Sequence, residues 1–543
     1  MAKDVLSNFK EHSVAEFFKK NRQMLGFSGK IRSLTTLVHE YVTNSLDACE
    51  ENGILPDITV KLEENADKHI IITVQDNGPG LPKKLVGKAL GMMLAGTKFH
   101  RYVQQRGQQG IGAAGASMYS QITTGKPVWF KTGTGDGKAY EGLLKIDFKT
   151  NRPTVTDEKE YDEEFRGLVV KAEFAEVKYD RSDKSPSEYL KRTALANPHA
   201  QILFVEPSGE RVLFPRASDK IPKKAKEVQP HPLGITTHDL MDFAHASQER
   251  KLSSFFVRTF QRFSQGKVKE LNELLPEIDF NKRPQKLEWH EAEKLIAAFD
   301  KVKWIAPETT ALIPIGAEQL EKAMQNIYNA EFMTTTERKP KVFRGGIPFM
   351  VEAALAYGGN AGKRRVDGKI SGDILRFSNK VPLLFDAGGC GLTESVKNMD
   401  WKRYNIRDFD NEPVSVLINF VSVHVPYTGA GKQAIVNEEE IVTEVRNAVM
   451  EAARQMQRYL QGKIKTASRE KKKKAIMKYI PQLAQDLPEL AGKGASKTVE
   501  KELVRMVQDK YDQTTLTEVE DEEEEEKPEE SLDDAPENGE KEE

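Results

Sequence analysis

Cysteine is nearly absent from this sequence, and long apolar runs are missing altogether. Two cysteines among 543 residues, Cys49 and Cys390, are too few for a disulfide framework or a cysteine metal cluster, so we expect both to be buried thiols. No run of about 18 apolar residues occurs, and the amino terminus lacks the apolar centre of a signal peptide. We therefore expect a cytoplasmic protein with no membrane partner.

A strong net charge is also lacking, but the two signs are distributed unevenly. The whole chain carries −2, and residues 518–543 hold 16 acidic residues and two lysines, a net of −14, which leaves +12 for residues 1–517. The basic part suggests a polyanionic partner such as nucleic acid, although solvated lysines also explain such a surface. The acidic tail is too charged to be buried, and we expect it to be disordered.

A chain of this length is too long for one hydrophobic core, so we expect three or four domains. Short β-branched or aromatic segments bounded by turn residues predict strands at 57–62, 70–75, 127–133, 139–148, 167–174 and 414–425. A Pro- and Lys-rich stretch at 214–234 predicts a linker, and helical periodicity follows it to about residue 305. One long helical pattern covers 436–462 and continues to 478. The sequence shows no internal repeats.

Polar side chains recur on one side of the helix predicted around residues 37–53. At about 100° per residue, Glu40, Asn44 and Asp47 fall within about 60° of one another. The opposite side carries Leu34, Val38, Tyr41, Val42, Ser45 and Cys49. An ordinary amphipathic helix with a solvated face would produce the same pattern, so the interpretation depends on the segments that follow.

The second predicted strand is followed at once by "VQDNGPGLP", in which Asp76, Gly78 and Gly80 have the spacing D-x-G-x-G. The glycines permit a tight turn and let a flat ring approach the backbone. A carboxylate at this place can accept a hydrogen bond from the amino group of adenine. A simple turn after a strand would also use these residues.

A glycine-rich stretch then opens a helix of small residues, with glycines at 107, 110, 112 and 115. Backbone amides at such a helix start can bind phosphate, and the positive end of the helix dipole favours this. A dinucleotide-binding turn is disfavoured because the preceding "FHRYVQQR" is polar, and no G-x-x-x-x-G-K-[ST] loop occurs. The order of helix, strand, D-x-G-x-G turn and glycine-rich lid therefore favours an ATP site.

This order resembles the Bergerat ATP-binding α/β sandwich of the GHKL proteins, which include gyrase, Hsp90-type chaperones, sensor histidine kinases and MutL. The resemblance implies that Asn44 ligates Mg²⁺ and that Glu40 orients and deprotonates the attacking water. Asp47 and His39 are expected to be structural. The implied ATP-binding residues are Asn44, Asp76, Gly78, Gly80, Thr97, Lys98, Gly107, Gln108, Gln109, Gly110, Ile111, Gly112, Ala113 and Ala114.

Further segments resemble the B subunits of DNA topoisomerase VI, the type IIB enzyme of archaea and some eukaryotes. They include "FFKKNRQMLGF" at 17–27, "GTKFHRYVQQRGQQGIG" at 96–112, "APETTALIPIG" at 306–316, "RFSNKVPLLFDAGGC" at 376–390 and "VPYTGAGKQAI" at 425–435. The resemblance implies an α+β multidomain protein. Its expected parts are a GHKL domain at 1–225, a helix-two-turn-helix insert at 226–305, a transducer domain with a stalk helix at 306–470, and a basic helical extension with the acidic tail at 471–543.

In such proteins a transducer lysine reaches the γ-phosphate of ATP, and "PYTGAGKQA" supplies Lys432 for this catalytic and ATP-binding role. A lysine in a flexible loop, next to Gly429 and Gly431, is the simpler interpretation. Two positions depart from the family pattern: Thr43 stands where an acid is frequent, and Leu168 stands where a threonine is frequent. The loss of that hydroxyl has no explanation in the sequence.

The resemblance implies an ATP-hydrolysing member of a heterotetramer of two A and two B chains. ATP-driven dimerisation of the B chains would gate the passage of one DNA duplex through a double-strand break made by the A subunit. A GHKL clamp or chaperone would share the first 120 residues but not the transducer segments. A non-hydrolysing scaffold would retain the fold, but the intact residues Glu40, Asn44, Asp76 and Lys432 argue against it. We reject the "DFD" triplet at 408–410 as a metal site.

Overall fold

The computed structural model describes residues 20–21, 26–93, 102–106, 112–364, 368–429 and 431–524, without the side chains of 512–524. The chain divides into two compact units, Met1–Met456 and Gln457–Glu543. Within the described ranges, no helix is both long enough and apolar enough to cross a membrane.

The first part of the larger unit is built on an eight-stranded sheet with the order β5-β4-β3-β6-β2-β1-β7-β8. Its strands are β1 (Asp57–Glu64), β2 (Ile70–Gln75), β3 (Val128–Thr134), β4 (Lys138–Asp147), β5 (Arg152–Asp162), β6 (Arg166–Phe174), β7 (Gln201–Val205) and β8 (Arg211–Phe214). The strands predicted in this region are confirmed. The sequence did not predict β5, β7 or β8. It missed β5 because this edge strand is almost wholly exposed and carries mostly polar residues.

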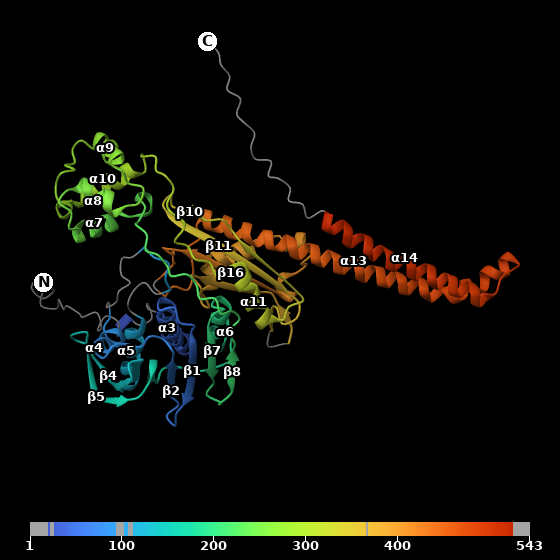
Figure 1. The fold of residues 1–543 in the computed structure, drawn as a ribbon, viewed down its shortest axis with the longest axis horizontal. Helices are drawn as coiled ribbons and strands as arrows, with labels where there is room; N and C mark the ends of the chain where they lie inside the picture. Colours follow the sequence, from blue (N-terminus) through green and yellow to red (C-terminus); the bar gives the residue numbers. More distant parts are fainter. Residues whose placement is uncertain are drawn as a thin grey trace, which may run out of the picture. The chain divides into compact units, whose positions relative to one another are not determined.

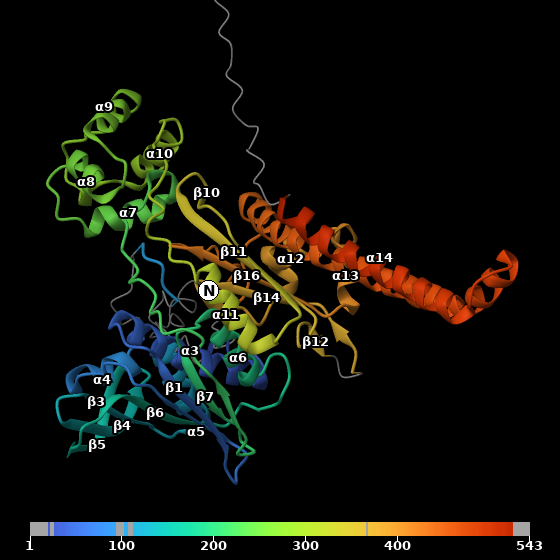
Figure 2. The ribbon, with the colours of Figure 1, turned by 45° about the vertical axis from the view of Figure 1, so that its right-hand side comes forward.

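Four helices cover one face of this sheet (Figure 2): α3 (Lys30–Glu51), α4 (Lys83–Gly91), α5 (Gly112–Thr124) and α6 (Pro186–Ala196). The apolar side of α3 is fully buried in the core between helices and sheet, with Leu34, Val38 and Val42 inaccessible to solvent. The predicted division of α3 into an apolar and a polar side is confirmed. Burial of Cys49 in the same helix confirms the expected core thiol, and Cys390 is also buried and free.

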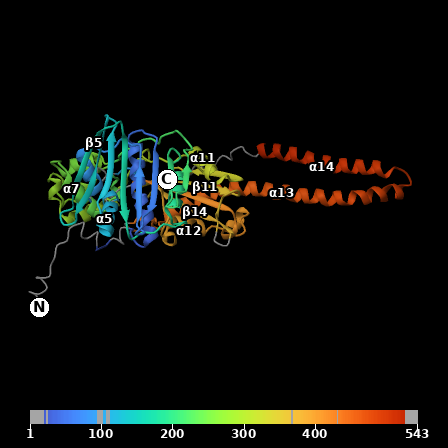
Figure 3. The same ribbon diagram turned by 90° about the horizontal axis from the view of Figure 1, so that it is seen from below.

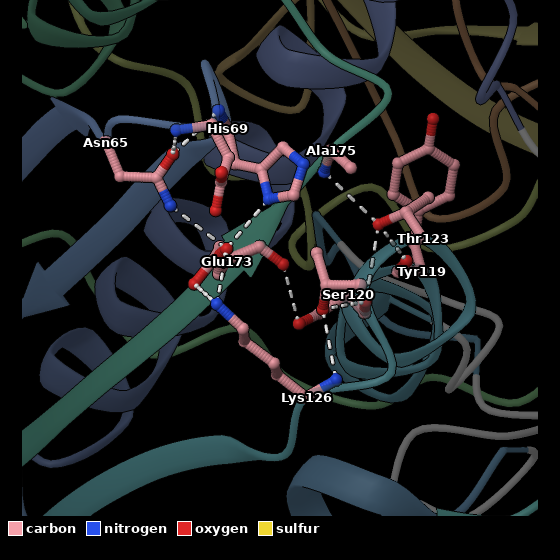
Figure 4. Close-up of polar contacts among 10 residues, drawn as sticks. Asn65, His69, Tyr119, Ser120, Thr123, Lys126, Glu173 and Ala175 are labelled. Carbon is pink, nitrogen blue, oxygen red and sulfur yellow. Dashed lines mark hydrogen bonds and ion pairs between the residues drawn. The ribbon is translucent and has the colours of Figure 1, made fainter.

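Polar contacts fix the carboxyl end of α5 to the sheet (Figure 4). The Ser120 hydroxyl donates to the backbone carbonyl of Glu173 at 2.9 Å. The Glu173 carboxylate accepts hydrogen bonds from Lys126 Nζ at 2.7 and 2.8 Å, and His69 Nδ1 lies 2.8 Å from the same carboxylate. Because these contacts hold one end of a short helix, they also set where its other end, at Gly112, begins.

A separate group of helices follows the linker, which contains neither helix nor strand between residues 215 and 231, as predicted. Its elements are η2 (Pro232–Gly234), α7 (Thr237–Ala246), α8 (Leu252–Thr259), α9 (Gln265–Leu274), η3 (Pro284–Lys286) and α10 (Trp289–Phe299). Phenylalanines dominate a core of their own, including Phe255, Phe256, Phe260, Phe263 and Phe299. A capping box between Thr236 and Asp239 starts α7.

The third part of the unit contains a six-stranded sheet with the order β10-β11-β16-β14-β15, and β9 also pairs with β11. Its elements are α11 (Ala317–Tyr328), β9 (Phe332–Glu337), β10 (Lys341–Phe343), β11 (Ile347–Tyr357), β14 (Asp373–Ser378), β15 (Val381–Pro382), α12 (Gly391–Lys397) and β16 (Val414–Ser422). A small ribbon of β12 (Lys363–Arg364) and β13 (Ile370–Ser371) lies between them in the chain. Every residue of β16 is buried, in agreement with its continuous apolar sequence.

Two long helices end the described chain. Helix α13 (Glu439–Ala491) extends beyond the predicted end at 478 and contains Pro481 and Pro488, and α14 (Ser496–Glu524) runs back in the opposite direction (Figures 1 and 3). Burial of Ile480 and Ala484 beside Pro481 offers packing that offsets the lost backbone hydrogen bond. The expectation of disorder from residue 518 is wrong for 518–524, because glutamate is a good helix former and α14 continues through it.

Candidate ATP-binding site

Helix α3 presents two of its three aligned polar residues to the surface. The Glu40 side chain is 30% exposed, and Asn44 is exposed with no hydrogen bond from any described residue. Asp47 is buried instead, at 8% exposure. The polar stripe therefore contains two accessible groups and one group that belongs to the interior.

The first residue of α5 lies directly against Glu40. A Cβ added to Gly112 would come within 2.8 Å of Glu40 Cδ, so any side chain here would displace the carboxylate from its position. Helix α5 begins at this residue, and the positive end of its dipole favours a negative group. The structure thus brings together Glu40 and Gly112, which are far apart in the sequence.

Asp76 is held by three hydrogen bonds at the end of β2. Its carboxylate accepts from Ser45 Oγ at 2.7 Å, from the Gly78 amide at 3.0 Å and from the Leu168 amide at 3.2 Å. Burial raises the pKa of Asp76, and these three donors oppose the shift. At Gly80 the backbone has φ +71°, and a Cβ would collide with the Gly133 carbonyl. The predicted need for glycine in this turn therefore has a steric cause.

The two departures from the family pattern have structural explanations. Leu168 contacts Asp76 through its backbone amide, which needs no hydroxyl, and its side chain packs on the main core. Thr43 lies in a buried group with His39 Nδ1 at 3.3 Å and the Tyr189 hydroxyl at 3.4 Å. Burial lowers the pKa of His39, which favours a neutral ring among these neutral partners, although the charge of Glu40 opposes this shift.

The His39 ring lies between Glu40 and α6. Its Nε2 is 3.9 Å from Glu40 Oε1, while its Nδ1 is 3.1 Å from the Tyr189 hydroxyl. The second contact supports a structural role for His39, because it fixes the ring against α6.

Lys432 belongs to the third part of the unit and lies near Glu40 and Asp47 of α3. Its loop follows β16, and the lysine has φ +51°, a left-handed conformation that is uncommon for a residue with a side chain. Burial lowers the pKa of Lys432, and the charges of Glu40 and Asp47 raise it again. The ammonium group is therefore within electrostatic reach of two carboxylates on α3.

The sequence did not point to Arg106, which joins three elements beside the site. Its guanidinium donates to Asp47 at 2.7 Å, to Glu50 at 2.5 Å and to Asn197 at 2.5 Å. His199 Nε2 lies 2.7 Å from Glu50 on the other side. Asp47 and Glu50 are separated by one helical turn, and this acidic pair was the only sequence signal for a buried cation.

Residues just before Arg106 contact the third part of the unit. The Gln104 side chain donates to the Ile313 carbonyl at 2.8 Å and accepts from the Ile313 amide at 2.6 Å. Asn379 Nδ2 donates to the Gln105 carbonyl at 3.3 Å. Lys380, which is buried and has φ +70°, lines a pocket with Arg106 and Asp47. The segment 104–106 thus contacts two parts of the unit: the first part through Arg106, and the third part through Gln104 and Gln105.

Part of the predicted site lies outside the described residues, namely Thr97, Lys98, Gly107, Gln108, Gln109, Gly110 and Ile111. Ala113 and Ala114 belong to the first turn of α5. The described chain has no group of three or more histidine, cysteine, aspartate or glutamate residues that could hold a metal ion. In the triplet at 408–410, Asp408 accepts a hydrogen bond from the Asp410 amide at 3.1 Å.

Comparison with known proteins identifies the family. The B subunit of type 2 DNA topoisomerase 6 from Methanothermobacter thermautotrophicus is 47% identical over 87% of this chain and 90% of its own. That of Pyrococcus horikoshii is 43% identical over 96% of this chain and 99% of its own. This chain belongs to the family of topoisomerase 6 B subunits.

Two family models match separate parts of this chain. The model for histidine kinase-, DNA gyrase B- and HSP90-like ATPases covers residues 29–149, and the model for the transducer of topoisomerase VI B subunits covers residues 307–474. The second match separates the chain from a GHKL chaperone or clamp, which would share only the first region. A solved DNA repair protein domain superimposes with a TM-score of 0.40 at 12% identity, which is too distant to support a conclusion.

Proposed function

We propose that this chain binds and hydrolyses ATP in the cytoplasm, as part of a heterotetramer of two A and two B chains that passes one DNA duplex through another. ATP binding would dimerise the B subunits around the transported duplex, and the A subunit would cleave the other duplex. The observation that carries the proposal is the 43% identity to a topoisomerase 6 B subunit over 96% of the chain. A basic charge of +12 on residues 1–517 is suited to a DNA partner.

Glu40, Asp76 and Lys432 each have surroundings that fit a role in ATP binding or hydrolysis. Glu40 is partly exposed beside the start of α5, where it could accept a proton from an attacking water. Asp76, fixed by three donors, could accept a hydrogen bond from the amino group of adenine. Lys432 could neutralise charge on the γ-phosphate: burial lowers its pKa, but the charges of Glu40 and Asp47, and of a phosphate, act to keep it protonated.

Asn44 fits the requirements of a magnesium site. Mg²⁺ is usually held by one or two protein oxygens together with phosphates and water, and Asn44 offers one exposed amide oxygen without a competing partner among the described residues. Bound there, Mg²⁺ would neutralise phosphate charge.

Relaxation of supercoiled DNA and decatenation by the chain with its cognate A subunit test this proposal. We expect both activities to require ATP, the A subunit and this chain together. Glu40→Ala should retain dimerisation with a non-hydrolysable ATP analogue and lose turnover, whereas Asn44→Ala should weaken Mg²⁺-dependent binding of the nucleotide. Activity of this chain alone, or wild-type turnover of Glu40→Ala, would contradict the proposal.

A further inference from the structure

The amino-terminal half of α3 is joined to the transducer region by one ion pair. Arg32 donates to both carboxylate oxygens of Asp386, at 2.9 and 2.8 Å, and its guanidinium lies over the Phe385 ring, 4.8 Å from the centroid. The hydrogen bonds from Arg32 lower the pKa of Asp386. A two-pronged pair that also stacks on an aromatic ring is better defined in geometry than an ordinary surface ion pair.

The same short segment, residues 383–386, holds the loop that carries Lys432. The Phe385 amide donates to Gln433 Oε1 at 3.2 Å. Arg376 is 2% exposed and donates to the Gln433 carbonyl at 3.3 Å and to the Phe385 carbonyl at 2.8 Å. Gln433, the residue after Lys432, is therefore fixed to the segment that Arg32 contacts.

The residue before Lys432 lies next to the ion pair itself. A Cβ added to Gly431 would lie 3.6 Å from Arg32 Nη2, in ordinary van der Waals contact. Gly429 and Gly431 give this loop many backbone conformations, and Lys432 occupies an uncommon left-handed one. The loop's own sequence does not select this conformation, so the contacts on each side of Lys432 must stabilise it.

Helix α3 carries both Arg32 and Glu40, which are eight residues apart, about 12 Å along a rigid helix. Phe385, the neighbour of Asp386 in the chain, is hydrogen-bonded to Gln433, and Arg376 donates to the carbonyls of both Phe385 and Gln433. The ion pair that holds Asp386 against α3 therefore also helps to set the distance between Lys432 and Glu40.

We propose that Arg32 and Asp386 are positioning residues that set Lys432 over the phosphate end of the ATP site. Neither residue touches the nucleotide in this proposal, and both act through the 383–386 segment and Gln433. The inference rests on the proposed role of Lys432 at the γ-phosphate. It predicts that breaking the ion pair impairs steps that depend on the γ-phosphate and leaves contacts with the adenine and the first two phosphates unchanged.

Asp386→Asn is the most informative substitution. Asparagine has the same size and tolerates the φ of +55° found at Asp386, so the change removes the charge with little strain. A matched control is Glu163→Gln. Glu163 accepts hydrogen bonds from Lys131 at 2.9 and 2.8 Å, and Lys131 lies 4.9 Å from the centroid of the Phe165 ring. The side chains of Lys131 and Glu163 are 22% and 48% exposed, close to the 23% and 51% of Arg32 and Asp386.

ATP turnover of the whole complex with its A subunit and DNA should fall about five- to tenfold in Asp386→Asn and stay near wild type in Glu163→Gln. Affinity for ADP should be unchanged in both variants, while affinity for a non-hydrolysable ATP analogue should fall only in Asp386→Asn. In a Lys432→Ala background, Asp386→Asn should cause no further loss, because the positioned group is absent.

Several outcomes would overturn the inference. Equal turnover in Asp386→Asn and Glu163→Gln would do so, as would an equal loss in the presence and absence of Lys432. Wild-type turnover of Lys432→Ala would instead refute the proposed role of Lys432, and the positioning role with it. If Lys432→Ala has too little activity to measure, hydrogen exchange of amides 431–435 decides: it should become faster in Asp386→Asn alone, and unchanged exchange would refute the inference.

Discussion

At the scale of single residues, glycine 112 is the position where backbone and chemistry are most tightly connected. Its hydrogen atom faces the Glu40 carboxylate at the start of α5, in a space that a methyl group would fill. Alanine generally favours helices by up to about 1 kcal/mol over glycine, so stability and activity should respond differently to this change.

We expect Gly112→Ala to displace the Glu40 carboxylate and lower ATP turnover by about 10- to 100-fold, with an unchanged or slightly higher melting temperature. Steady-state ATPase assays and thermal melts measure the two effects. Gly462→Ala is a suitable control, because this helical glycine has no neighbouring atom within 4 Å of an added Cβ. Turnover in Gly112→Ala equal to that of the control would show that Glu40 does not need this space.

His199 should make stability depend on pH. Burial lowers its pKa below the ordinary value of 6.5, although the hydrogen bond with Glu50 opposes the shift. The unfolded chain therefore binds more protons between the two pKa values, and the contribution of His199 is complete above about pH 6.5 and is lost as pH falls through the folded pKa.

His199→Gln retains a hydrogen-bond donor for Glu50 and removes the titration. We expect the melting temperature to fall less steeply between pH 7 and pH 5 in this variant than in the wild type. His238→Gln should leave the slope unchanged, since the His238 side chain is 74% exposed. Identical slopes in all three proteins would argue against a neutral, buried His199.

At the scale of elements, Arg106 stabilises the contact between α3, α6 and the segment that precedes the glycine-rich stretch. Its exposure is only 9%, and it neutralises two carboxylates on α3, Asp47 and Glu50. The charge and hydrogen bonds of Arg106 and the hydrogen bond from His199 lower the pKa of Glu50, against burial, which alone would raise it. Removal of the arginine would take away the cation that pairs with both of these carboxylates.

We expect Arg106→Leu to destabilise the larger unit by about 3–5 kcal/mol, the usual cost of breaking a buried ion pair. Calorimetric unfolding of wild type and variant would measure this loss. Arg181→Leu provides the contrast, because Arg181 also pairs with two glutamates but its side chain is 61% exposed, so the expected loss is below about 1 kcal/mol. Similar losses in the two variants would mean that burial does not decide the strength of these pairs.

At the scale of the whole molecule, charge is separated along the chain. Helix α13 carries exposed lysines at 465, 471, 472 and 474, while residues 518–543 hold a net charge of −14. Competition of the acidic segment with DNA for basic surfaces would weaken DNA binding, most visibly at low salt.

Deletion of residues 518–543 should therefore increase the affinity for duplex DNA, by about threefold or more near 50 mM salt and less at higher salt. Titrations of the full-length and shortened chains at several salt concentrations would measure both affinity and salt slope. The same affinities and slopes in both proteins would leave the acidic segment as an aid to solubility only.

The sequence by itself determined the local features of this protein. The two sides of α3, the strands β1 and β2, and the glycines at 78 and 80 follow from helical periodicity, β-branched composition and turn sterics, all of which act over a few residues. The accessible positions of Glu40 and Asn44 could be predicted for the same reason. The acidic segment was misjudged where glutamates extend α14, because charge opposes burial but does not oppose a solvated helix.

Only the tertiary structure decided the partners of the buried and interdomain charges. Arg106 could have paired with many acids, and Arg32 lies 354 positions from Asp386 in the chain. Neither composition nor periodicity specifies such pairs, because a side chain's partner depends on which elements pack together and on their register. Lys432 was found through resemblance, but its left-handed backbone and its proximity to the charge of Glu40 are properties of the packed loop.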